Sequence, residues 1–283
     1  MHPFIAIITS VDSDHLDIYG NQQAFHEAFS SFISNIVPKG TLIIKNNLNL
    51  PLPISVDRVD YTYGVNEDAD FFASELRLVN GLYTFNFTYP NGKINNLTLG
   101  IPGLYNVENA VAALAAAILA GVTPAELSMG LATFKGVKRR FDIRFNENNK
   151  VYIDDYAHHP EELKACINSA KAMFPGRKLT GIFQPHLYTR TRDFAAEFAK
   201  SLAMLDEVLL LPIYPARELS IPGIDSQMLL DLMDHKNKHL IRKKDIPGYF
   251  YDNPPQVVLT LGAGDIDTLV EPLENFFKIN KTK

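Results

Sequence analysis

The sequence has 283 residues, of which 46% are hydrophobic and 21% are charged, and its net charge is -5 at pH 7. This length and apolar content allow two ordinary domains, each with a buried core. The acidic balance argues against a nucleic-acid-binding protein, which usually carries a basic face. The single cysteine, Cys166, excludes an internal disulfide bond and a Cys-rich zinc site.

No apolar stretch has the length of a membrane span, because the longest run, residues 111–121, is short and rich in alanine. Residues 1–10 lack the charged, apolar and cleavage regions of a signal peptide. We therefore expect a cytoplasmic protein without membrane insertion, in which Cys166 is a buried structural thiol.

The first half of the chain reads as mixed α/β. A buried-strand pattern at residues 4–10 precedes a polar run, and an amphipathic helix follows at 22–35. After a short apolar strand at 41–45, residues 55–99 alternate β-rich runs with turn signals such as Asn91-Gly92, which predicts antiparallel ribbons. Because the strand pattern begins at residue 4, we expect that the complete protein has further sequence before it.

Two helices close this first half. An apolar helix is predicted at 106–120, followed by Gly121 in the position after its end. Thr123 and Pro124 then have the residue types that begin the next helix. The pattern changes near residues 138–141, which predicts two domains, 1–139 and 140–283.

The second half alternates apolar strands with amphipathic helices, which predicts a parallel sheet covered on both faces. The predicted strands are 151–155, 178–184, 207–213 and 257–261, and the predicted helices are 160–174, 192–205, 226–235 and 266–277.

Polar residues collect where the predicted strands end, which is where open α/β sheets bind ligands. These segments are DDYAHHP (154–160), FQPHLYTRTR (183–192), YPARE (214–218) and GAGD (262–265). Simpler interpretations stay open: Asp265 as a helix N-cap, the paired histidines as a solvated loop, and Arg190 with Arg192 as surface charge. In the first half, the acidic run 12–17 around His15 either holds Mg²⁺ or a phosphate, or forms a capping turn.

Together these segments resemble the Mur ligase family, and within it the alanine-adding branch. The motifs that carry the resemblance are ITSVDSDHLDIYG (8–20), IPGLYNVENAVAA (101–113), GVKRRFD (136–142), DDYAHHPEE (154–162), FQPHLYTRT (183–191), YPARE (214–218) and LGAGDI (261–266). They recur in the family's order over nearly the whole chain.

The resemblance implies an α/β enzyme of three domains: an N-terminal UDP-sugar domain, a P-loop-type central ATPase domain and a Rossmann-like C-terminal domain. Residues 1–139 would be an incomplete central domain, and 140–283 the amino-acid-binding C-terminal domain with its mainly parallel sheet. The implied reaction uses ATP and Mg²⁺ to convert the carboxylate of UDP-N-acetylmuramate into an acyl phosphate, which the amine of L-alanine attacks during peptidoglycan precursor synthesis. The sequence does not predict an oligomeric state.

The resemblance also implies roles for single residues. Nucleotide and metal would be held by His15 on Mg²⁺, Asn106 and Asn109 near the adenine, Arg140 on the ATP phosphates and Asp155 on the ribose. The incoming alanine and the sugar-nucleotide carboxylate would be surrounded by Tyr156, His158, His186 and Arg190. The catalytic set implied in this way is His15, Arg140, His158, His186 and Arg190.

The sequence departs from the family pattern at several places. It holds no G-x-x-x-x-G-K-[ST] loop, since its Gly92-Lys93 pair is followed by Ile94, and the family's glutamate for Mg²⁺ is missing. Leu187 stands where the family usually has arginine, a contact that Arg192 or Arg217 would have to replace. Phe29 stands where sister ligases have a carbamoylated lysine, which agrees with the alanine-adding branch.

Two alternatives to the alanine-adding function remain. One is a recycling ligase of the same family that attaches a whole tripeptide to the same acceptor. The other is a non-catalytic nucleotide or amino-acid binding module. Because no phosphate-binding loop is present, we expect no ATP-dependent ligation by residues 1–283 alone.

Overall fold

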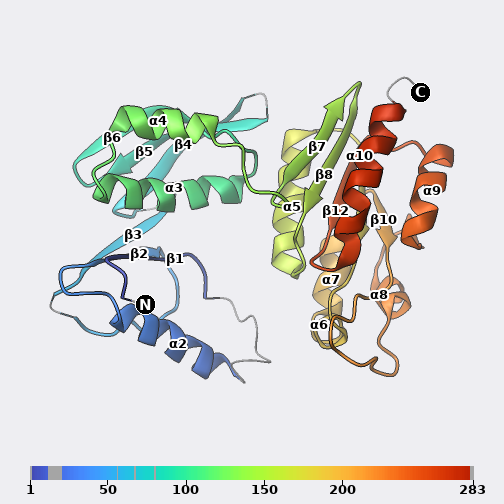
Figure 1. The fold of residues 1–283 in the computed structure, drawn as a ribbon, viewed down its shortest axis with the longest axis horizontal. Helices are drawn as coiled ribbons and strands as arrows, with labels where there is room; N and C mark the ends of the chain where they lie inside the picture. The colour runs from blue at the N-terminus through green and yellow to red at the C-terminus, as the bar shows by residue number, and fades with distance from the viewer. Residues whose placement is uncertain (1, 12–20, 56, 67, 80, 281–283) are drawn as a thin grey trace. The chain divides into compact units, whose positions relative to one another are not determined.

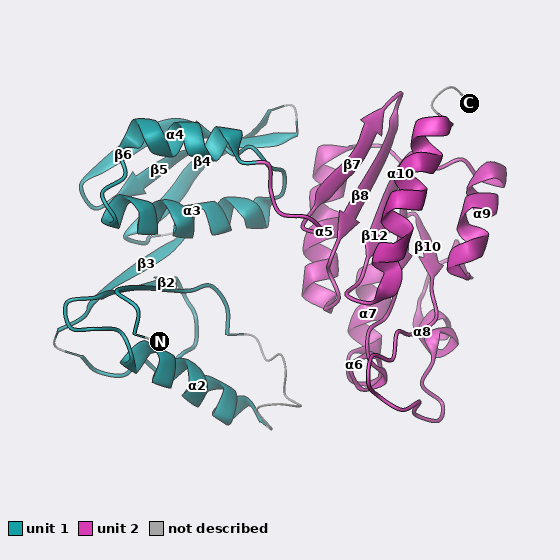
Figure 2. Ribbon diagram, viewed as in Figure 1, with its two compact units in different colours: residues 1–134 teal, residues 135–283 magenta. Residues whose placement is uncertain are grey.

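The computed structural model describes residues 2–11, 21–55, 57–66, 68–79 and 81–280. The chain forms two compact units, Met1–Phe134 and Lys135–Lys283 (Figure 2). The boundary predicted from the sequence, 139/140, lies with this one in the segment between the last helix of unit 1 and the first strand of unit 2. His15 lies outside the described residues.

Unit 1 contains a sheet and three helices within its described residues. Its strands are β1 (Ile5–Ile8), β2 (Thr41–Lys45), β3 (Val59–Val65), β4 (Phe71–Val79), β5 (Leu82–Tyr89) and β6 (Gly92–Thr98). Its helices are α2 (Gln22–Ser34), α3 (Leu104–Leu119) and α4 (Pro124–Thr133).

The strands of unit 1 lie in the order β1-β2-β3-β4-β5-β6. The antiparallel ribbons predicted for this region are confirmed for β4, β5 and β6. The prediction was wrong for β3, which pairs in parallel with both β2 and β4. Alternating side chains show that a segment is a strand but not which way its partner runs.

The Asp70 carboxylate fixes the β3–β4 connection by accepting from the Thr62 backbone N–H at 2.7 Å and from its hydroxyl at 2.9 Å.

Helices α2 and α3 cover opposite faces of this sheet, because successive residues of a strand point to opposite sides. In β2, Ile43 packs in the cluster that contains Val111 of α3, whereas Leu42 packs in the cluster that contains Ile33 of α2. Figure 1 labels both helices and the strands β1, β2 and β3 of this sheet.

The helix ends predicted in unit 1 are confirmed. Gly121 follows α3 with φ 89°, a left-handed conformation that suits glycine. The backbone N–H groups of Gly121 and Val122 then donate to the carbonyls of Ile118 and Ala117, which satisfies the last turn of α3. At α4, Thr123 and Glu126 form a reciprocal capping box, with proline following the cap.

Unit 2 contains a second sheet with helices on both faces. Its strands are β7 (Asp142–Glu147), β8 (Lys150–Asp155), β9 (Leu179–Phe183), β10 (Glu207–Leu210), β11 (Lys238–Leu240) and β12 (Val257–Leu261). Its helices are α5 (Pro160–Met173), α6 (Tyr188–Asp193), α7 (Ala195–Leu202), α8 (Ser226–Leu232), η1 (Lys243–Asp245), α9 (Ile246–Asp252), η2 (Asp265–Leu269) and α10 (Val270–Ile279).

The predicted parallel sheet is confirmed. The strand order is β11-β10-β9-β12-β8-β7, and every pairing is parallel except that of β7 with β8. The side chains of β9, β10 and β12 are all buried. Phe250 of α9 and Phe277 of α10 pack on one face beside Tyr152, which explains why these strands read as continuous apolar runs.

Three features of unit 2 differ from the sequence prediction. Strand β7 was missed, although the turn that joins it to β8 contains Asn148 and Asn149 with φ 49° and 59°, as a two-residue hairpin turn requires. The predicted helix 192–205 is two helices, α6 and α7, and 266–277 begins as the 3-10 helix η2. The interpretation of Asp265 as an N-cap was wrong: Gly264 is the cap residue, and the Asp265 carboxylate binds Lys243 at 2.8 Å instead.

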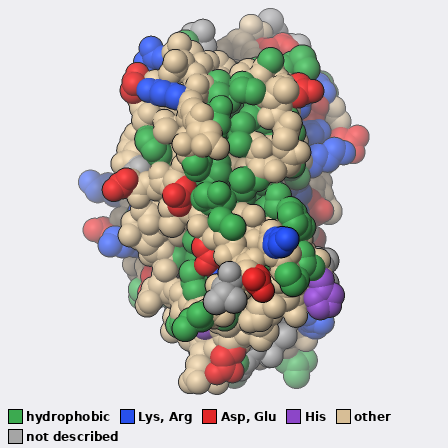
Figure 3. All heavy atoms as spheres, turned by 90° about the vertical axis from the view of Figure 1, so that its left-hand side faces the viewer, with side chains coloured by type: hydrophobic (Ala, Val, Ile, Leu, Met, Phe, Trp, Pro, Cys, Tyr) green, Lys and Arg blue, Asp and Glu red, His purple; other side chains and the backbone are tan. Residues whose placement is uncertain are grey.

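Several large apolar side chains stay exposed, including Ile54, Met129 and Val137. Figure 3 shows hydrophobic side chains gathered in a band along one face of the molecule. Such a band differs from the single exposed apolar residues that occur on every protein surface.

Candidate active site

The carboxyl ends of four parallel strands of unit 2 lie at one edge of its sheet. In the strand register, Leu261 of β12 pairs with Asp155 of β8 on one side and with Phe183 of β9 on the other. Phe183 in turn pairs with Leu210 of β10. The loops that follow these strands carry the polar motifs of the sequence, so those motifs occupy a single edge.

Four rings from three of these loops contact one another in a row. The centroids of Tyr156 and His158 are 5.2 Å apart, those of His158 and His186 are 6.3 Å apart, and those of His186 and Tyr214 are 5.7 Å apart. The His186 and Tyr214 rings are nearly parallel, at 17°. The structure thus brings together Tyr156, His158 and His186, and adds Tyr214, which the sequence analysis did not assign.

His158 is oriented by its own loop. Its Nδ1 lies 3.0 Å from the Tyr156 carbonyl oxygen and 3.3 Å from the Glu162 carboxylate, and both of these can only accept, so Nδ1 carries a proton. The Glu162 carboxylate accepts from the backbone N–H groups of His158 at 2.9 Å and His159 at 3.2 Å. The first turn of α5 therefore fixes the histidine loop.

His186 is held in a less polar setting. Burial lowers its pKa below the ordinary value for histidine, and the charges of Arg190 and His158 lower it further, while Glu218 opposes them. Among the residues that the structure describes, its Nδ1 is buried without a hydrogen-bond partner. Burial and the neighbouring cations therefore favour the neutral form of the His186 ring, which can accept a proton.

Arg190 lies in α6, close enough to His186 for its charge to lower the pKa of that ring. Arg192 points elsewhere, because its Nε binds the carboxylate of Asp193 at 2.7 Å and its side chain is exposed. Arg217 is also exposed, in the loop after β10. Within this helix, Arg190 is thus the arginine associated with the row of rings.

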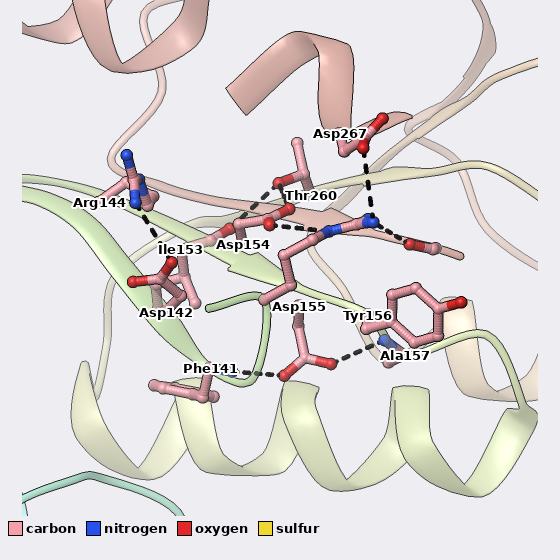
Figure 4. Close-up of polar contacts among 12 residues, drawn as sticks. Phe141, Asp142, Arg144, Ile153, Asp154, Asp155, Tyr156, Ala157, Thr260 and Asp267 are labelled. Carbon is pink, nitrogen blue, oxygen red and sulfur yellow. Dashed lines mark hydrogen bonds and ion pairs between the residues drawn. The ribbon is translucent and has the colours of Figure 1, made fainter. Parts of the chain in front are cut away.

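Asp154 and Asp155 point to opposite sides of β8 (Figure 4). The Asp155 carboxylate accepts from the backbone N–H groups of Phe141 and Ala157, both at 2.7 Å. It is only 5% exposed. Burial raises the pKa of Asp155 to about 6, although both hydrogen bonds favour the ionised form. In this structure the carboxylate holds two turns of its own chain.

Asp154 is the central acceptor of a buried polar chain that was not predicted from the sequence (Figure 4). Arg139 donates to Asp154 at 3.2 Å, and Thr260 donates to its other oxygen at 2.7 Å. The Tyr152 hydroxyl lies 3.0 Å from Thr260. Arg139 also donates to the Gly262 carbonyl at 2.6 Å. The doubled arginine before Phe141 was the available signal, but only the second arginine had been assigned.

Arg140 lies beside the same edge. Its guanidinium carbon is 5.4 Å from the centre of the Tyr156 ring, and that of Arg139 is 5.0 Å from it. The Tyr156 backbone N–H donates to the Arg139 carbonyl at 2.7 Å. Tyr156 is therefore packed against two cations, both within cation–π distance.

The asparagines assigned to the adenine lie in α3 of unit 1. Asn106 is buried, and its amide nitrogen donates to the Pro102 carbonyl at 2.6 Å. That bond fixes the amide and leaves its oxygen as an acceptor. Asn109 is exposed one turn further along the helix.

The metal site expected at His15 lies outside the described residues. Within the described ranges, no group of three or more His, Cys, Asp or Glu side chains is placed to hold a metal ion. The helices in the same ranges are too short or too polar to cross a membrane.

Two family models match the chain: the Mur ligase middle domain over residues 1–117, and the Mur ligase glutamate ligase domain over residues 139–264. The chain belongs to the Mur ligase family. The boundary between the two matches falls in the same region as the boundary between the two compact units.

Similar proteins point to one branch of the Mur ligases. The chain is 49% identical over 272 residues to a UDP-N-acetylmuramate–L-alanine ligase of Parabacteroides distasonis, covering 96% of this chain and 59% of that protein. It is 48% identical over 280 residues to the protein of the same name from Porphyromonas gingivalis, covering 98% and 61%.

A crystal structure of the UDP-N-acetylmuramate–alanine ligase MurC from Thermotoga maritima has the same fold. The TM-score is 0.80 with 26% sequence identity, over 98% of this chain and 60% of that one. This Mur ligase chain therefore spans about 60% of the length of the relatives that it matches.

Proposed function

We propose that the full-length protein is an ATP-dependent ligase that joins L-alanine to UDP-N-acetylmuramate in peptidoglycan precursor synthesis. The observation that carries the proposal is the 49% identity over 272 residues to a protein with that name. The row of rings supports it, because His158 and His186 come from loops far apart in the sequence and meet where α/β sheets bind ligands.

The side chains at this edge suit amide formation. An amine that attacks an activated carboxyl group must lose a proton, and charge develops on the carboxyl oxygen. Neutral His186 is the acceptor that we assign to the proton, since burial and its cationic neighbours lower its pKa. The Arg190 guanidinium can bind the carboxylate of the amino acid in two-point geometry.

The residues that the family resemblance assigns to the nucleotide are considered for each unit by itself. Asn106 and Asn109 offer amide donors and acceptors that match the edge of a purine, and the bond to Pro102 orients one of them. Arg140 would bind phosphate and Asp155 the ribose. ATP, when bound, supplies the phosphoryl group that activates the substrate carboxyl group. Mg²⁺ is assigned to His15, which lies outside the described residues.

The proposal is tested by phosphate release from the full-length protein with ATP, UDP-N-acetylmuramate and L-alanine. We predict that Arg190→Lys raises the KM for L-alanine about tenfold or more, because a lysine cannot form the paired hydrogen bonds. Arg192→Lys is the matched control, since Arg192 is exposed and bound to Asp193, and its KM should match the wild type. Equal KM values for both variants would exclude Arg190 from amino-acid binding.

A tripeptide-adding recycling ligase is the second candidate, because it would use the same sugar-nucleotide acceptor. Offering the full-length protein L-alanine or the tripeptide distinguishes the two functions. Phosphate release stimulated by the tripeptide alone would replace the alanine assignment. We also propose a cytoplasmic location, since the reaction consumes ATP.

A further inference from the structure

One carboxylate joins the loop after β10 to the helix that bears Arg190. Glu218 accepts from the backbone N–H of Thr189 at 3.0 Å and from the Thr189 hydroxyl at 2.5 Å. Thr189 is the second residue of α6, where a backbone N–H has no partner within the helix. A residue 29 positions away in the sequence therefore satisfies the start of α6.

The backbone of the two loops is joined as well. His186 and Tyr214 form an isolated parallel bridge, in which Leu187 donates to the Tyr214 carbonyl at 3.0 Å. Tyr214 donates back to the Pro185 carbonyl at 2.8 Å. The turn from Pro215 to Glu218 is closed by a 2.9 Å bond from the Glu218 N–H to the Pro215 carbonyl. Glu218 thus projects from a loop that is itself fixed beside His186.

The first turn of α6 has little freedom around Arg190. Leu187, the residue before the helix, has φ 70°, a conformation that costs a non-glycine residue energy and must be held by its surroundings. Thr191 is fully buried, and its hydroxyl donates to the Leu187 carbonyl at 2.7 Å. Arg190 therefore lies between two anchored threonines, one of which is anchored by Glu218.

We propose that Glu218 is a positioning residue, whose carboxylate binds the start of α6 and fixes Arg190 and His186 relative to each other. The consequence of this positioning for amino-acid binding rests on the proposed ligase function, whereas the effect of Glu218 on the start of α6 does not. This gives the YPARE motif a role distinct from substrate contact.

Charge supports the same arrangement. The groups that act on His186 are Arg190, His158 and Glu218, with the Tyr214 ring stacked on its face. Two of them disfavour a charged imidazole, and Glu218 is the one carboxylate among these groups that opposes them. Removing its charge while keeping its shape should therefore lower the pKa of His186 further.

Amide hydrogen exchange on the chain of residues 1–283 tests the geometric part directly. In Glu218→Ala, we expect the Thr189 amide to exchange about tenfold faster than in the wild type, because it loses its charged acceptor. In Glu218→Gln, the side-chain oxygen still accepts, so protection should largely return. The Ile182 amide within β9 reports whether each variant keeps the fold. Unchanged exchange of Thr189 in a folded Glu218→Ala variant would overturn the proposal.

An NMR titration of the His186 ring gives a second readout that does not need the alanine variant to fold. Glu218→Gln should lower the pKa of His186, whereas Glu197→Gln, an exposed carboxylate on α7, should leave it unchanged. The same pKa in both variants would contradict the proposal.

Kinetics of the full-length protein test whether Glu218 affects the binding of L-alanine. We expect Glu218→Ala to raise the KM for L-alanine about tenfold with a smaller change in kcat, and Glu218→Gln to restore most of the loss. Unchanged KM in Glu218→Ala would overturn the role in binding. Absence of ligation in the wild type would instead reject the proposed function. The exchange and titration experiments would still test whether Glu218 positions α6 and acts on His186.

Discussion

The pair of carboxylates at the end of β8 shows how burial sets the behaviour of single residues. Asp155 is nearly inaccessible, and burial raises its pKa to about 6 even though two backbone N–H groups bind it. Its neighbour Asp154 is also buried, but Arg139 and Thr260 oppose the rise in its pKa. Desolvation outweighs hydrogen bonding at both positions.

The raised pKa of Asp155 predicts a pH-dependent free energy of unfolding. Between about pH 4 and pH 6 the folded protein holds a proton that the unfolded chain releases, so stability falls as the pH rises through this window. Relative to Asp155→Asn, which does not titrate, the wild type should lose up to about 3 kcal/mol from pH 4 to pH 7.5. Urea unfolding of both proteins at the two pH values measures this, and a pH-independent difference would contradict it.

Arg139 provides a second prediction at the residue scale. Its partner Asp154 has a side chain that is only 1% exposed, so removing the guanidinium leaves a buried charge without its cation. We expect Arg139→Ala to lower the free energy of unfolding by on the order of 3 kcal/mol. Arg192→Ala is the matched control, because it breaks an exposed ion pair and should change stability little. Similar unfolding midpoints for the two variants would refute the role of Arg139.

Among the secondary-structure elements, helix ends followed local rules that the sequence displays. Gly121 after α3 and Thr123 with Pro124 at the start of α4 fulfil requirements of the backbone within a few residues, and both predictions are confirmed. The parallel direction of β3 was not predicted, because the alternation of side chains within a strand does not show which way its partners run. Strand β7 was missed for a related reason: it is a polar edge strand without a continuous apolar run.

The capping box of α4 gives a prediction for this scale. Thr123→Ala removes the side-chain oxygen that accepts from the Glu126 backbone N–H. We expect a loss of about 1 kcal/mol in the free energy of unfolding of unit 1. Ser128→Ala, within the same helix, removes a hydroxyl that bonds only to the preceding turn, and should cost less. A larger loss for Ser128→Ala would show that the cap contributes little to this helix.

The candidate site could be predicted only in part from the sequence. The motifs placed Tyr156, His158 and His186 at strand ends, and the parallel register explains why they meet. Tyr214 and the anchoring role of Glu218 were not foreseen, because they depend on how the loop after β10 lies against the loop after β9. The role of His15 stays a prediction, since it lies outside the described residues.

For the whole molecule, the two matched family domains account for most of the chain, which spans about 60% of the length of its relatives. The sequence contains no phosphate-binding loop of the P-loop type. We predict that purified residues 1–283 release no phosphate from ATP when both proposed substrates are present, because backbone N–H groups that cradle the phosphates are needed for catalysis. Phosphate release by this chain alone would contradict the prediction.

The addition of L-alanine to UDP-N-acetylmuramate by the full-length protein, as proposed, can be measured on the sugar nucleotide itself. Mass spectrometry of the sugar nucleotide after incubation with ATP and both L-alanine and the tripeptide tests it most directly. We predict a product heavier than UDP-N-acetylmuramate by one alanine residue, formed only when ATP is present. A product that carries the tripeptide alone, or no ATP-dependent product, would contradict it.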